Sequence, residues 1–100
     1  MRCDPYEQHV APGDEVRLEV VYTNHSAEPR EATCRPVLPP EWGVEVGARS
    51  EGGAARAEFR VPFAWIVPRD AAPGRYVVPV DVNYAGRRLG QFREAIVVVV

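Results

Sequence analysis

The chain of 100 residues has the length of one domain, and its 46% hydrophobic and 26% charged residues are ordinary for a folded protein. Its net charge of −2 argues against a nucleic-acid partner, which normally requires a basic surface. The longest apolar run, 95–100, is too short to span a membrane, and the N-terminal residues lack the apolar segment of a signal peptide. We expect a single domain over 1–100, part of a larger protein because the chain stops within an apolar run, with the cytoplasm favoured over secretion.

Prolines interrupt the chain too often for long helices, because a helix interior does not tolerate Pro, and there are 10 of them. Between the prolines, apolar and polar residues alternate with the period of two that is typical of half-buried strands. This alternation is clearest over 16–23, 55–63 and 76–84, and shorter strands are expected at 6–10, 31–35, 44–46 and 92–99.

Turn signals separate these segments. They are Pro12-Gly13, residues 24–29, residues 50–53 and the tight pair Ala85-Gly86. About seven short antiparallel strands with turns between them are the signature of a β-sandwich. The sequence therefore predicts an all-β, immunoglobulin-like or fibronectin type III-like fold.

Three aromatic residues have expected structural roles. Tyr76 follows the Pro73-Gly74 turn at the start of a strand, where immunoglobulin-like folds place a tyrosine corner whose hydroxyl bonds to upstream backbone. The alternative is an ordinary core tyrosine. Trp42 and Trp65 lie among apolar residues, and we interpret both as core side chains in preference to ligand platforms.

The segments 10–16, 22–26, 38–44 and 68–76 together resemble the NPCBM-associated domain, a family of immunoglobulin-like modules found beside bacterial α-galactosidases and other hydrolases. They are also similar to the adhesion-type CARDB domains. The stretch 86–97 resembles accessory domains that follow metallo-β-lactamase-fold hydrolases. These resemblances imply an immunoglobulin-like fold and a hydrolase as the parent protein. They carry over no catalytic or metal-binding residue, because nothing here matches the histidine motif of those enzymes.

Residues with catalytic or metal-binding chemistry are few and far apart. His9 and His25 are expected near opposite ends of strands, about 30 Å apart, so they cannot share a metal or a proton. Cys3 and Cys34 have no ligand-spaced neighbours, and both a disulfide and two buried thiols remain open. Asn24 begins a glycosylation pattern that we expect to be a chance match. We therefore predict no catalytic residue, no metal site and no cofactor.

The positive signal for function is an apolar surface. Val77 and Pro79 alternate with the core series of their strand, and Val97 and Val99 lie in a last strand that is apolar on both faces. A two-sided apolar strand suggests that the outer face is also covered, although Val is favoured in any strand. We also expect the last strand to form a sheet edge with free amide groups.

The predicted function is an accessory module that docks on the catalytic domain of its parent protein or on a second copy of itself. The alternative is a carbohydrate- or cell-surface-binding module that uses Trp42, Trp65 or the loops.

Overall fold

The computed structural model describes every residue except Phe92, and the described residues form eight strands and a short 3-10 helix. The strands are β1 (Arg2–Asp4), β2 (Glu7–Val10), β3 (Glu15–Thr23), β4 (Arg30–Pro36), β5 (Arg49–Gly53), β6 (Glu58–Ile66), β7 (Gly74–Tyr84) and β8 (Arg87–Val99), and the helix is η1 (Pro40–Trp42). None of the described residues form a helix of the length and apolarity that crossing a membrane requires.

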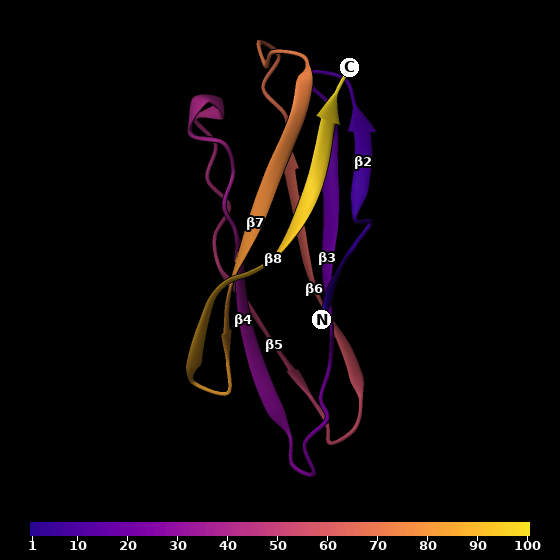
Figure 1. Ribbon diagram of the computed structural model, residues 1–100, viewed down its shortest axis with the longest axis vertical. Coiled ribbons are helices and arrows are strands. Elements are labelled where there is room, and N and C mark those ends of the chain that lie inside the picture. Colours follow the sequence, from indigo (N-terminus) through magenta and orange to yellow (C-terminus); the bar gives the residue numbers. More distant parts are fainter.

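The strands form two sheets that pack face to face (Figure 1). The three-stranded sheet has the order β1-β3-β6, and the five-stranded sheet has the order β2-β8-β7-β4-β5. Neighbouring strands are antiparallel, except that β2 runs parallel to β8. The chain is therefore an all-β sandwich, as the sequence predicts, but with eight strands and one parallel pair in place of about seven antiparallel strands.

The core lies between the sheets and is built by the alternation seen in the sequence. In β3, Val16 and Leu18 are fully buried while Arg17 between them is exposed. The valines at alternate positions of β7, from Val78 to Val82, face them from the other sheet and are equally buried. Each such side chain contributes about 1.5–3 kcal/mol to stability, so these two strands carry much of the fold.

The region between β4 and β6 differs from the prediction. Residues 44–46, predicted as a strand, lie in an irregular segment after η1, and residues 50–53, predicted as a turn, belong to strand β5. The turn comes later, over 54–57, so β6 begins at Glu58 and not at residue 55. Gly53 is required for packing: a Cβ atom added there would overlap the ring of Phe59. Gly53 therefore marks a close approach between two strands, not a turn.

The hairpin between β7 and β8 is the predicted one. Ala85 and Gly86 both have positive φ, 52° and 77°, as the two central residues of a tight hairpin turn with the twist of the strands require. Of the predicted last strand, 92–99, Phe92 lies outside the described residues and the rest belongs to β8. β8 lies between β2 and β7, so the prediction that it forms a sheet edge is wrong. The short strand β1 had no counterpart in the prediction.

Candidate functional site

The outer face of the five-stranded sheet carries an exposed apolar cluster. Val77 of β7 lies directly opposite Ile96 of β8, and Val98 and Pro79 lie in the rungs on either side. Val77 is 45% exposed and Tyr6, whose carbonyl accepts a hydrogen bond from the amide of Ile96, is 54% exposed. We refer to Tyr6, Val77, Pro79 and Val98 as the apolar patch; Ile96 points to the same side but is only 1% exposed, so it already lies covered within the chain.

Two of the predicted interface residues do not belong to this surface. Val97 and Val99 are 0% and 2% exposed and pack in the core between the sheets. The reason is the pairing of β8 with β7, which places Val97 opposite Tyr76, on the inner face. Val77 and Pro79 do lie on the outer face, as predicted. Ile96 and Val98 take the places that the sequence analysis gave to Val97 and Val99.

The pairing also explains how the correct face of β8 could have been found. A regular hairpin from the Ala85-Gly86 turn would pair Val77 with Glu94. Because residues two apart in a strand share a face, Ile96 and Val98 would then lie on the same side as Glu94. The structure contains two register shifts, between residues 80 and 81 and between 82 and 83, and they bring Ile96 opposite Val77. Two shifts of one residue each leave the face unchanged.

Charged side chains border the apolar patch. On one side, Arg75 reaches across β8 toward Glu7 of β2, with 4.0 Å between Nε and Oε1, and this pair covers Ile96. His9 contacts the same carboxylate at 3.3 Å. On the other side, Glu94 lies opposite Pro79 and is exposed. The ion pairs of Glu7 with Arg75 and with His9 are exposed to water, so neither contributes much to stability.

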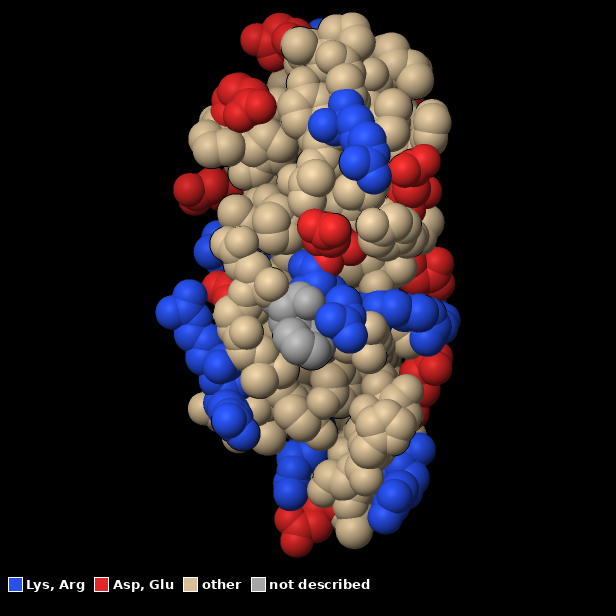
Figure 2. Space-filling model, viewed as in Figure 1, with Lys and Arg blue, Asp and Glu red and all other residues tan. Residues whose placement is uncertain are grey.

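The lower half of the same face has a different chemistry. Figure 2 shows that uncharged side chains dominate the upper half of this face, while most of the Arg side chains gather in the lower half. There Arg35 lies opposite Asp81, and Arg88 lies 3.9 Å from the carboxylate of Asp81. The apolar patch is therefore confined to one half of the face.

A cavity of about 550 Å³ opens at the edge of the apolar patch. Its walls combine Tyr6, Pro79 and Glu94 with the N-terminal residues Met1 and Cys3. It thus lies where β1 of one sheet approaches β8 of the other. The side chain of Arg93 closes this seam by donating a hydrogen bond of 3.0 Å to the carbonyl of Met1.

The outer face of the three-stranded sheet is charged. Arg60 of β6 lies 3.0 Å from Asp4 and 2.9 Å from Glu19, so one guanidinium links all three strands. Val21, which points to this side, is buried beneath such side chains. The two outer faces of the sandwich therefore differ in their centres: one carries ion pairs and the other carries the apolar patch, although the edge strand β6 also exposes Pro62, Ala64 and Ile66 on the charged face.

The tyrosine corner predicted from the sequence is present. The hydroxyl of Tyr76 donates a hydrogen bond of 2.6 Å to the carbonyl of Ala72, four residues upstream. The Tyr76 ring packs 4.8 Å from the ring of Trp42, centroid to centroid. Trp42 and Trp65 are 6% and 5% exposed, so both are core side chains and neither offers a surface on which a sugar ring could stack. Their ring N–H groups meet no acceptor among the described residues.

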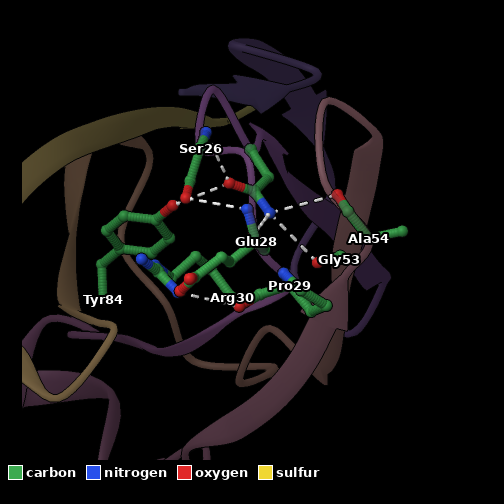
Figure 3. Close-up of polar contacts among 8 residues, drawn as sticks. Ser26, Glu28, Pro29, Arg30, Gly53, Ala54 and Tyr84 are labelled. Atoms are coloured by element: carbon green, nitrogen blue, oxygen red, sulfur yellow. Dashed lines mark hydrogen bonds and ion pairs between the residues drawn. The ribbon is translucent and has the colours of Figure 1, made fainter.

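Asn24 is a buried polar hub directly after β3. Its side-chain nitrogen donates to the carbonyls of Glu28, Gly53 and Ala54, which are labelled in Figure 3, at 2.8, 3.2 and 3.1 Å. Its side-chain oxygen accepts hydrogen bonds from the Ser26 amide and the Tyr84 hydroxyl. The amide is fully buried and used in folding, so it is not accessible to a glycan. The asparagine of the glycosylation pattern therefore has a structural role in this protein.

The two cysteines are free thiols buried in the core, Cys3 from β1 and Cys34 from β4. Burial raises the pKa of each thiol to about 11, and the proximity of Cys3 adds to the shift in the pKa of Cys34. Among the described residues, no three or more His, Cys, Asp and Glu side chains cluster in a way that could hold a metal ion.

A comparison of the chain with protein-family models, curated proteins and solved structures found no significant match. The resemblance to NPCBM-associated domains, and the hydrolase as parent protein, therefore stay predictions from the sequence.

Proposed function

We propose that this domain is a non-catalytic interaction module that binds a protein partner through the apolar patch on its five-stranded sheet. The observation that carries the proposal is the exposure of Val77 and Tyr6 together at the centre of one outer face, where the other outer face carries ion pairs. A free sandwich gains nothing from Val77 and Tyr6 in water, and its opposite face shows that this fold is compatible with a charged surface. Contiguous exposed apolar side chains are typical of surfaces that bind other proteins.

The composition of the apolar patch fits a protein partner. It combines an aromatic side chain, Tyr6, with aliphatic ones and is bordered by Arg75, Glu7 and Glu94, as in an interface with an apolar centre and a polar rim. The patch is small, which fits docking within a larger protein or a weak association. Attachment to a bacterial hydrolase is part of the proposal and rests on the sequence resemblance alone.

Site-specific photo-crosslinking tests this function in the protein that carries the domain. A photoreactive amino acid replaces Val77 or, as a matched control, Ile66, which is 53% exposed on the other sheet opposite Glu15. We expect position 77 to crosslink to one defined peptide and position 66 to give only diffuse, weak products. Equal and diffuse crosslinking from both positions would contradict a docking role for the apolar patch.

A further inference from the structure

We infer that the partner of the apolar patch is a second copy of this chain, packed face to face with its strands antiparallel to those of the first. This inference rests on the proposed function and adds the identity of the partner. It follows from the arrangement of charges around Val77 and Ile96, which is self-complementary under a two-fold rotation.

The centre of the arrangement is the rung formed by Val77 and Ile96. Arg75 lies two residues before Val77 along β7, and Glu94 lies two residues before Ile96 along β8. Because β7 and β8 are antiparallel, the positive and the negative charge lie on opposite sides of this rung, each about 7 Å away along the strands.

A two-fold axis that crosses the strands at the central rung brings these charges together. It lays β7 of one copy over β7 of the other in the reverse direction, so Arg75 of each copy meets the Pro79–Glu94 rung of its partner. The contact forms twice, as in any isologous interface. At the same time Val77 of each copy packs over the central rung of its partner, which removes the 45% of Val77 that is exposed from water, whereas Ile96 is already buried in the single chain.

Other face-to-face arrangements are less favourable. A two-fold axis along the strands would place Arg75 beside Arg75 and Glu94 beside Glu94, and like charges repel. A shifted arrangement would lay the apolar patch over the lower half of the face, where Arg35, Asp81 and Arg88 lie. The apolar side chains would then displace water from charged groups, which is costly.

The cavity at the edge of the patch accommodates the arriving side chain. Glu94, Pro79 and Tyr6 form part of its wall, and its volume of about 550 Å³ exceeds that of an arginine side chain. In the single chain, the contact of Arg75 with Glu7 is loose, with 4.0 Å between Nε and Oε1, and the Arg75 side chain is 61% exposed. Arg75 can therefore exchange this contact for Glu94 of a second copy.

Sedimentation equilibrium of the full chain over a concentration series, with reciprocal charge reversals, tests the inference. Wild type should form a weak dimer. Arg75→Glu and Glu94→Arg, each alone, should weaken it about tenfold or more, because each reversal creates two repulsive pairs. A mixture of the two variants, or the double reversal Arg75→Glu/Glu94→Arg in one chain, should restore association.

The controls keep the outcomes distinct. Arg69→Glu, an exposed reversal away from the patch, should leave the dimer unchanged. A wild type that stays monomeric at millimolar concentration would overturn the second-copy inference. The crosslinks from position 77 would then decide whether the apolar patch has a docking function. If neither Arg75→Glu nor Glu94→Arg changed the affinity of the dimer, the contact would lie on another surface, and this too would overturn the inference.

Discussion

The hydroxyl of Tyr84 donates a hydrogen bond of 3.2 Å to the side-chain oxygen of Asn24, although 60 residues separate them in the chain. Through the same amide, the loop after β3 is tied to the backbone of Gly53 and Ala54. One buried side chain thus joins parts of both sheets. This explains why the structure retains a polar group in an otherwise apolar interior.

Replacing Asn24 should therefore destabilise the fold strongly. We expect Asn24→Ala to lower the free energy of unfolding by about 2–3 kcal/mol, because carbonyls lose their donor without gaining access to bulk water. Asn24→Asp should be no better, since a carboxylate cannot donate to carbonyls. Urea unfolding measures both, with exposed His25→Ala as the neutral control. If Asn24→Ala matched the wild type, the hub would have no energetic role.

The tyrosine corner should make a smaller contribution. Tyr76→Phe removes the hydrogen bond to Ala72, and we expect a loss of about 1 kcal/mol because the carbonyl lies near the surface and water can replace the hydroxyl. Tyr6→Phe, which changes an exposed tyrosine, should not alter the urea midpoint. If Tyr76→Phe and Tyr6→Phe had the same effect on the urea midpoint, the hydroxyl of Tyr76 would contribute nothing to stability and its ring would act only by packing.

The glycine of β5 tests the account of that strand. Gly53→Ala places a methyl group in the ring of Phe59 and should cost about 1–3 kcal/mol, as overpacking in a core usually does. Gly47→Ala has open space around the new methyl and should have little effect. The pair is compared by thermal unfolding. If Gly53→Ala were as stable as Gly47→Ala, β5 and β6 would not approach as closely as described.

The buried thiols predict how stability depends on pH. Burial raises the pKa of Cys3 and of Cys34 from 9.0 to about 11, so the folded protein holds these protons more tightly than the unfolded chain. Their contribution is complete below the unfolded pKa and is lost as pH rises through the folded one. We expect the urea midpoint to fall between pH 9 and 11 under reducing conditions, and the Cys3→Ala/Cys34→Ala variant to fall less steeply. Parallel slopes for the two proteins would refute this.

Sequence periodicity predicted the inner faces of the strands in which apolar residues recur at every second position. These faces, from Val16 in β3 and from Val78 in β7, could be assigned without a structure. β8 could not be assigned in this way, because Ile96 and its neighbours are apolar on both faces and only pairing decides which side is buried. The glycines of β5 were misleading, since Gly signals both turns and close packing.

The candidate site was partly predictable for the same reason. Val77 and Pro79 follow from the alternation of β7, whereas the contribution of Tyr6 depends on β2 pairing in parallel with β8. A parallel contact between strands at opposite ends of the chain leaves no local signal in the sequence.

The most direct test of the account compares lysine substitutions at adjacent positions on the two sides of the five-stranded sheet. Val77→Lys should keep its free energy of unfolding within about 0.5 kcal/mol of wild type, as exposed positions usually do, and should abolish association in sedimentation. Val97→Lys, which buries an unpaired charge in the core, should prevent folding. A Val77→Lys protein that unfolds, or one that is stable and associates as the wild type does, would contradict the claim that the exposed Val77 of this outer face serves binding and not folding.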